Sequence, residues 1–185
     1  MDVSGDGALD DVRRLLLERF PLVGDHPDVA GLLRDADALA ALGPALVAHY
    51  REAGITAVVA PEARGPVLGA LAAVSLGVGL VVVRKDPANH PGADLKVRSE
   101  PTWRGAPIDF QGRSFDLDPS DRVLIVDDWI TTGSSIRAVA AVVGQIGATV
   151  VGVSVLVDKA EPATLVELDV RALVRFSDIG RGAPA

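Results

Sequence analysis

Apolar and polar residues alternate along the chain in blocks that predict strands and helices in turn. Continuous apolar runs, typical of strands buried on both faces of a parallel sheet, occupy residues 55–60, 79–85, 122–128, 149–159 and 170–176. Segments with helical spacing occupy residues 9–19, 36–53 (ended by Gly54), 66–76 and 134–146. This alternation predicts an α/β fold with a doubly wound parallel sheet and right-handed crossovers.

Residues 86–121 interrupt this pattern. They are rich in Pro, Gly, Arg and Asp, with only short apolar pieces such as 108–110. Loops of this length inside compact domains are usually functional or disordered, so we expect a long flexible loop here, with room for a β-ribbon within it. The whole chain, residues 1–185, is of a size that suits one domain.

Composition narrows the range of partners. The formal net charge is −7, which argues against a broad surface for DNA or RNA. The absence of cysteine removes disulfides, thiolate metal sites and cysteine nucleophiles, and it fits a reducing cytosol. The acidic first residues differ from a signal peptide, and the longest apolar stretch, 67–83, is shorter than the ~20 residues that span a bilayer. We expect a cytoplasmic protein with no nucleic-acid or membrane partner.

Four polar segments follow the predicted strands. They read PEARG (61–65), RKDPANH (84–90), DDWITTGSS (127–135) and DKAEPA (158–163). In parallel α/β sheets, ligands bind at the carboxyl ends of the strands. The candidate site therefore lies where these four segments meet.

The segment TTGSS lies between a buried strand and the start of a helix. Unpaired N–H groups at a helix N-terminus bind phosphate, and four hydroxyl groups flank Gly133, which allows close approach of the backbone. An ordinary Ser/Thr helix cap is the alternative interpretation. Asp127 and Asp128 favour a ligand, because a second acid at a buried strand end is costly without a partner. The segment matches neither the Walker A pattern nor G-x-G-x-x-G, and acids beside a phosphate cradle suit a sugar phosphate.

These residues resemble a known family. VLIVDDWITTGSS (123–135) is similar to the phosphoribosyl-pyrophosphate (PRPP) loop of type I phosphoribosyltransferases. Residues 57–85, DVAGLLRDADAL (28–39) and LVRFSDI (173–179) resemble the adenine phosphoribosyltransferase branch, so that the likeness spans roughly residues 25–180. The resemblance implies a hood formed by the chain ends, mainly residues 1–53, a flexible catalytic loop over 86–121, and a homodimer.

The resemblance also implies roles for single residues. Asp127 and Asp128 are the expected catalytic acids, which hold the ribose hydroxyls and the shell of a Mg²⁺ ion carried by PRPP. The expected 5′-phosphate ligands are Thr131, Thr132, Gly133, Ser134 and Ser135. The expected pyrophosphate ligands are Ala63, Arg64, Gly65, Arg84 and Lys85. On the residues alone, 61–65 could be a surface turn, and Arg84 and Lys85 could be solvated charges.

The long loop and the base pocket carry the remaining expectations. Glu100, in RSEPTWRG (98–105), matches a loop-tip glutamate that assists the leaving or attacking group, and Trp103 suits a lid. The base pocket is expected at His26, Val126 and Trp129, although Trp129 also suits a subunit contact. The branch places an aromatic residue where this chain has His26-Pro27-Asp28, and it has a lysine after its Arg-Lys pair where this chain has Asp86.

The sequence therefore predicts a Mg²⁺-dependent enzyme. It would transfer the 5-phosphoribosyl group from PRPP to a nitrogenous, purine-like base and release pyrophosphate. Two alternatives stay open. One is a PRPP-sensing regulatory protein of the same fold, and the other is a transferase that makes a specialised metabolite.

Overall fold

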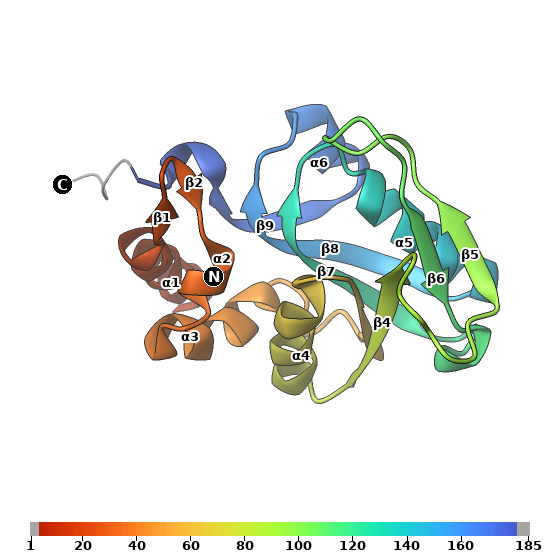
Figure 1. The fold of residues 1–185 in the computed structure, drawn as a ribbon. Helices are drawn as coiled ribbons and strands as arrows, with labels where there is room; N and C mark the ends of the chain where they lie inside the picture. Colours follow the sequence, from red (N-terminus) through yellow and green to blue (C-terminus); the bar gives the residue numbers. More distant parts are fainter. Residues whose placement is uncertain (1–3, 181–185) are drawn as a thin grey trace.

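A seven-stranded sheet organises residues 4–180, the part of the chain that the computed structural model describes (Figure 1). Its strand order is β5-β6-β4-β3-β7-β8-β9. Five strands are parallel: β4 (Gly79–Lys85), β3 (Ala57–Pro61), β7 (Arg122–Ile130), β8 (Thr149–Asp158) and β9 (Val170–Arg175). This confirms the predicted α/β fold with a parallel core. Residues 1–3 and 181–185 of the predicted single domain lie outside the described part.

The segment 86–121 adds an antiparallel ribbon at one edge of the sheet. Strands β5 (Leu95–Arg98) and β6 (Asp109–Gly112) pair with each other, and β6 pairs with β4. A short 3₁₀ turn, η1 (Ser114–Asp116), follows. The expected β-ribbon is therefore present, and the loop consists of the residues around it, at 86–94, 99–108 and 113–121.

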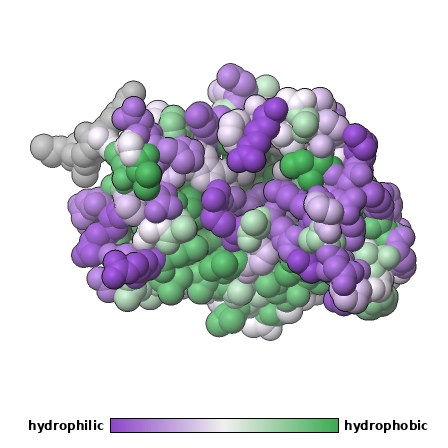
Figure 2. Space-filling model, in the orientation of Figure 1, coloured by the Kyte–Doolittle hydropathy of each residue, from purple (hydrophilic) through white to green (hydrophobic). Residues whose placement is uncertain are grey.

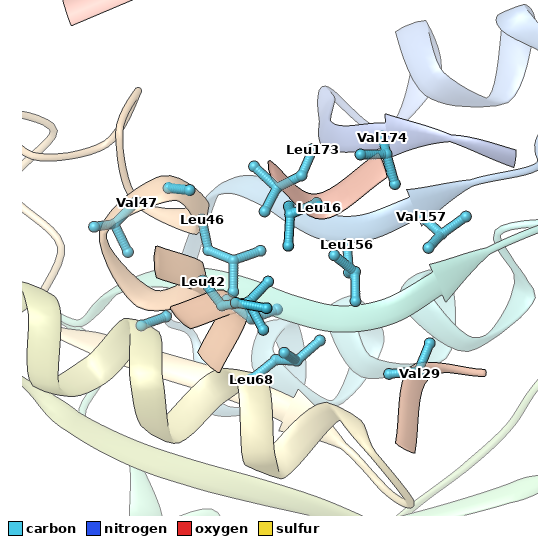
Figure 3. Packing of buried hydrophobic residues seen from close by; sticks show 14 of the residues in the cluster. Leu16, Val29, Leu42, Leu46, Val47, Leu68, Leu156, Val157, Leu173 and Val174 are labelled. Carbon is cyan, nitrogen blue, oxygen red and sulfur yellow. The ribbon is translucent and has the colours of Figure 1, made fainter. Parts of the chain in front are cut away.

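Helices cover both faces of the sheet, as the alternation of side chains along β7 requires. Leu124 and Val126 pack in one apolar cluster with α3 (Ala36–Leu46) and α4 (Gly65–Leu76). Val123 and Ile125 point the other way and pack with α5 (Ser134–Ile146). Figure 3 shows the first cluster, where Leu42 of α3 and Leu68 of α4 meet Leu156 of β8. Burial on both faces explains why these strands read as continuous apolar runs.

The remaining elements surround the sheet. They are α1 (Ser4–Arg19), β1 (Leu22–Val23), β2 (His26–Pro27), α2 (Val29–Leu32), α6 (Pro162–Glu167) and η2 (Phe176–Asp178). α1 packs against α3 and β9, and the short β1–β2 hairpin lies on the same side, at the left of Figure 1. The N-terminal elements therefore stand beside one end of the sheet.

Helix α3 is shorter than predicted. It ends at Leu46, whereas the sequence pattern suggested a helix to Ala53. Pro44 lies in its last turn and has no N–H to donate, and the chain then continues in i→i+3 turns, with Tyr50 N donating to Val47 O at 2.9 Å. Val47 and Tyr50 in this segment are buried in the core, and periodicity alone does not distinguish such buried positions from those of a helix.

Candidate active site

A cavity of about 690 Å³ opens at the carboxyl ends of the parallel strands. It is lined by residues from all four segments expected at this edge, together with β2 and the β5–β6 loop: His26, Glu62, Ala63, Arg64, Lys85, Thr102, Trp103, Arg104, Ile108, Asp127, Asp128, Trp129, Thr131, Ser135 and Lys159. The sheet topology thus brings together most of the residues that the sequence singled out.

Two carboxylates lie on the floor of the cavity. Asp127 and Asp128, near the end of β7, are only 7% and 9% exposed. The backbone N–H of Asp128 donates to Asp127 Oδ1 at 2.8 Å. Burial, reinforced by the adjacent Asp128 charge, raises the pKa of the Asp127 carboxyl well above its ordinary value. Burying two carboxyl groups side by side lowers the stability of the fold, so their presence here indicates that they serve a function.

The predicted phosphate loop surrounds a small hollow that adjoins the cavity. All five of its residues, 131–135, line this hollow. Gly133 is the N-cap residue of α5 and adopts φ +76°. Because it has no side chain, it makes no capping hydrogen bond to the helix. The Thr132 hydroxyl donates to Ser134 Oγ at 3.0 Å. Without a capping side chain, the N-terminal end of α5 can offer its first backbone N–H groups to an anion.

The predicted pyrophosphate residues divide into two groups. Ala63, Arg64 and Lys85 line the cavity. Gly65, the first residue of α4, lies against the floor, since a Cβ there would be 3.0 Å from Asp127 Oδ1. Arg84 does not line the cavity, contrary to the prediction. Its Nε donates to Glu62 Oε1 at 2.7 Å and its Nη1 to the carbonyl of Asn89 at 2.5 Å, so that its charge is already engaged.

Aromatic rings form one wall of the cavity, where His26 and Trp129 are among the lining residues. His26 stacks on Trp129 with ring centroids 5.8 Å apart and an interplanar angle of 15°. Phe176 lies 5.8 Å from Trp129 on a tilted plane, and Lys159 Nζ is 4.1 Å from the centroid of the Phe176 ring. Among residues 4–180, no carboxylate lies within 4.0 Å of Lys159 Nζ. This wall therefore combines a stacking surface with an unpaired cation.

Val126 does not belong to this wall, contrary to the prediction. Its side chain is fully buried in the cluster that also contains Leu124, and it is not among the residues that line the cavity. The cause is its position inside β7, where packing with α3 and α4 covers its side chain.

The loop between β5 and β6 also lines the cavity. Thr102 and Trp103 line both the cavity and the phosphate hollow, and Arg104 and Ile108 line the cavity. Glu100 does not line either one. Its side chain is 69% exposed and lies 3.5 Å from Arg137 Nη1. Trp103 thus lies at both the cavity and the phosphate hollow, whereas Glu100 contacts Arg137 and lies at neither.

Several lining residues were not predicted. Lys159, Glu62 and Arg104 lie in three segments that the sequence did single out, at 158–163, 61–65 and 98–105. The available signal for Glu62 was its place beside Ala63 and Arg64, and for Lys159 and Arg104 it was a charged residue within a segment already singled out. Within residues 4–180, no helix is long and apolar enough to cross a membrane, and no cluster of three or more His, Cys, Asp or Glu residues could hold a metal ion alone.

Comparison with known proteins agrees with this geometry. The phosphoribosyl transferase domain family matches residues 32–178. The adenine phosphoribosyltransferase of Streptomyces coelicolor is 38% identical over 154 residues, which cover 80% of this chain and 83% of that protein.

Solved structures show the same fold. The adenine phosphoribosyltransferase of Thermoanaerobacter pseudethanolicus superposes with a TM-score of 0.75 at 27% identity, covering 90% of this chain and 99% of the other. The Giardia lamblia APRTase, solved with 9-deazaadenine, superposes with a TM-score of 0.76 at 26% identity, covering 90% and 97%. The comparisons name enzymes and give the regulatory alternative no support. The chain belongs to the phosphoribosyltransferase family, and its activity is the transfer of a phosphoribosyl group from PRPP to a purine base.

Proposed function

We propose that PRPP binds along the floor of the cavity, with its 5′-phosphate in the loop 131–135 and its pyrophosphate at Ala63, Arg64 and Lys85. The observation that carries this proposal is the position of Asp127 and Asp128, which lie in the same cavity as these two anion-binding groups. A ligand that fits this arrangement has an anionic group at each end and hydroxyl groups in the middle. A ribose that carries a phosphate and a pyrophosphate has this form. Carboxylates accept hydrogen bonds from ribose hydroxyls and are poor partners for phosphate.

The reaction exchanges two bonds at C1 of the ribose. A nitrogen of the base forms the new bond while the bond to pyrophosphate breaks and its electron pair leaves with the pyrophosphate. Positive charge develops on the ribose ring, and the buried carboxylates of Asp127 and Asp128 are placed to favour it. Arg64 and Lys85 offset the charge that gathers on the leaving group. Trp103 and Thr102 cover the cavity, and exclusion of water there would protect PRPP from hydrolysis.

A Mg²⁺ ion fits this site if the protein and PRPP share its coordination. Asp127 and Asp128 are oxygen donors of the type that Mg²⁺ prefers, but two carboxylates alone do not complete its six ligands. Diphosphate and water oxygens would provide the rest, so that the ion would arrive with PRPP. Its chemistry when bound would be to neutralise the diphosphate. A requirement for added Mg²⁺ in PRPP binding, measured by calorimetry, tests this assignment.

Two purines are candidates for the acceptor. Adenine is favoured by the names of the relatives. A purine with a ring carbonyl is favoured by Lys159, because an ammonium group donates hydrogen bonds and accepts none. The amino group of adenine is also a donor, so that with adenine only the ring nitrogens could accept a hydrogen bond from this cation. His26 and Trp129 supply the stacking surface in both cases, in place of the aromatic residue that the branch usually has.

The surface of α4 supports a homodimer. This helix contains no charged residue, and Val74 is 83% exposed on it. Figure 2 shows apolar side chains gathered over the part of the surface where Figure 1 places α4. An exposed apolar face of this kind marks an interaction surface, and a second copy of the chain is the partner that the resemblance implies. Val74→Asp should shift the protein from dimer to monomer in sedimentation analysis, and an unchanged mass would oppose this interface.

The activity is tested directly with Mg-PRPP and separate purines. Pyrophosphate release and the nucleotide formed are followed by mass spectrometry for adenine, hypoxanthine, xanthine and guanine. Lys159→Met keeps the length of the side chain and removes its charge. Loss of turnover with carbonyl purines alone would support the second acceptor, and no turnover with any base would contradict the proposed activity. A cytoplasmic location fits the absence of cysteine.

A further inference from the structure

Arg137 holds the phosphate loop from behind. It lies in the first turns of α5, and its guanidinium contacts three segments of the chain. We infer that Arg137, anchored by Glu167, is a positioning residue that fixes the direction in which the loop 131–135 presents its backbone N–H groups to the 5′-phosphate. This inference rests on the proposed placement of that phosphate.

The anchor is a two-pronged ion pair between α5 and α6. Arg137 Nε donates to Glu167 Oε1 at 2.9 Å, and Arg137 Nη2 donates to Glu167 Oε2 at 2.7 Å. Such a pair fixes the plane of the guanidinium as well as its place. The arginine also holds the pKa of the Glu167 carboxyl below its usual value. Arg137 is therefore oriented before any ligand binds.

The remaining nitrogen of Arg137 reaches the phosphate loop. Its Nη1 donates to the carbonyl oxygen of Thr132 at 2.9 Å. In a planar trans peptide, the carbonyl of one residue and the N–H of the next point in opposite directions. Holding the Thr132 carbonyl toward Arg137 thus turns the Gly133 N–H away from Arg137. Within residues 4–180, this N–H has no protein acceptor, which leaves it available to an anion.

The packing around Gly133 shows that the loop is supported on this side. A Cβ at Gly133 would lie 2.8 Å from Leu168 Cδ1 and 2.9 Å from Thr164 Cγ2, and 3.2 Å from Arg137 Nη1. Arg137 and the α6 region therefore form one supporting surface behind the loop. Loss of the arginine would leave the Thr132 peptide without its hydrogen bond and free to rotate.

The charge of Arg137 is unusual for its position. A cation near a helix N-terminus opposes the helix dipole, so that an arginine there is costly unless something offsets it. Glu167 provides that offset, and a bound phosphate would add to it. The contact with Glu100, at 3.5 Å, is longer and exposed, and it joins the lid loop to the same guanidinium. Arg137 therefore links the phosphate loop, α6 and the lid.

The test separates the two ends of PRPP. Ribose 5-phosphate probes the loop 131–135, and inorganic pyrophosphate probes Arg64 and Lys85. Both are titrated by calorimetry into the wild-type protein, R137Q, R137K and E167Q. The control is R113Q, because Arg113 forms the same kind of two-pronged pair, with Asp116, away from the cavity.

We expect R137Q to weaken ribose 5-phosphate binding by about 10-fold or more, since a charge-assisted hydrogen bond and a fixed peptide are lost. R137K and E167Q should weaken it less, but in the same direction. Pyrophosphate binding should stay within roughly twofold in all of them, as should both ligands in R113Q. In turnover, the KM for PRPP should rise more than kcat falls.

Melting temperatures distinguish positioning from a purely structural role. A role in stability alone would lower the melting temperature of R137Q, E167Q and R113Q alike and leave ribose 5-phosphate affinity unchanged, which would overturn the inference. Equal losses for both ligands would overturn it too. If the wild-type protein binds pyrophosphate but not ribose 5-phosphate, the placement of the 5′-phosphate is itself wrong, and the proposed function falls with the inference.

Discussion

The Arg64 guanidinium donates a hydrogen bond from Nε to Oδ2 of Asp128 on the floor of the cavity. The two residues have separate expected partners, pyrophosphate for Arg64 and ribose for Asp128. In this structure, the Arg64 guanidinium and the Asp128 carboxylate therefore bind each other through the groups that would otherwise bind PRPP. The Arg64 side chain is 53% exposed, so that this pair contributes little to stability and is readily exchanged for contacts with PRPP.

Arg64→Gln should therefore separate binding from stability. We expect the affinity for pyrophosphate to fall by about 10-fold or more, because a charged donor is lost from the site. The free energy of unfolding should change by less than about 1 kcal/mol, the upper end of the usual range for an exposed ion pair. Calorimetric titration and urea denaturation measure the two quantities.

Arg98→Gln is the matched control for this prediction. Arg98 is also exposed and lies 3.5 Å from an acid, Asp109, but it does not line the cavity. Its replacement should leave pyrophosphate affinity unchanged. Equal losses in the two variants would mean that Arg64 acts only through the net charge of the protein.

Asp127→Asn should stabilise the protein and impair it as an enzyme. Burial raises the pKa of this carboxyl in the folded state, so the charged form is less favourable there than in the unfolded chain. The amide keeps an oxygen to accept from the backbone N–H of Asp128. We expect a gain in unfolding free energy at pH 7 and a large loss of turnover.

The pH dependence of this gain follows from the sign of the shift. An acid with a raised folded-state pKa costs stability once pH rises above its unfolded value, near the ordinary 3.8. The difference between Asp127→Asn and the wild-type protein should therefore grow as pH rises from the acid range. Asp118 has the opposite shift, because Ser120 hydrogen-bonds its carboxylate. Asp118→Asn should lose stability at neutral pH, and the same sign in both variants would refute the argument.

Tyr50 should make the protein sensitive to alkali. Burial raises its pKa from 10.0 to about 12, and its hydroxyl donates to the carbonyl of Val153 at 3.1 Å. The folded state holds this proton more tightly than the unfolded chain, so stability is present below pH 10 and falls between pH 10 and about 12. Tyr50 is the only tyrosine, which makes its ultraviolet titration unambiguous.

Tyr50→Phe checks the source of that sensitivity. The variant should lose about 1 kcal/mol at pH 7, the usual worth of one hydrogen bond. Its stability should then fall less steeply than that of the wild-type protein above pH 10. Parallel curves in urea denaturation at each pH would assign the alkaline loss to other groups.

Much of the fold and of the cavity was predictable from the sequence because the signals were local. Strands buried on both faces read as continuous apolar runs, and parallel strands must bring their carboxyl ends to one edge. This placed Asp127, Asp128, Arg64 and the phosphate loop together. Val126 was assigned to the base pocket, although its side chain is fully buried in the core.

Other features were not predictable, because long-range partners decide them. Arg84 reads as a pyrophosphate ligand until Glu62, which lies on the neighbouring strand end, engages it. Glu100 matches a catalytic glutamate, yet it lies against Arg137 from α5. The sequence contains no local pattern that predicts the contact between Arg137 and Glu167, which lie thirty positions apart. Side-chain pairing across the sheet edge is a property of tertiary structure.

Gly133 and Gly77 provide a paired test of the phosphate loop. Both adopt a left-handed backbone, with φ +76° and +72°. An alanine in this conformation costs about 1 kcal/mol. At Gly77 the added methyl group meets nothing within 4 Å, whereas at Gly133 it would lie 2.8 Å from Leu168 Cδ1. Overpacking of this kind costs a further ~1–3 kcal/mol.

Gly77→Ala should therefore lower the unfolding free energy by about 1 kcal/mol, and Gly133→Ala by about 2–4 kcal/mol. The difference between them isolates the contact of the loop with α6 and Leu168, because the backbone strain is common to both. Since relief of that contact must move the loop, Gly133→Ala should also weaken ribose 5-phosphate binding, and Gly77→Ala should not. Equal stability losses with unchanged binding would mean that the loop can shift away from α6 at no cost to its ligand.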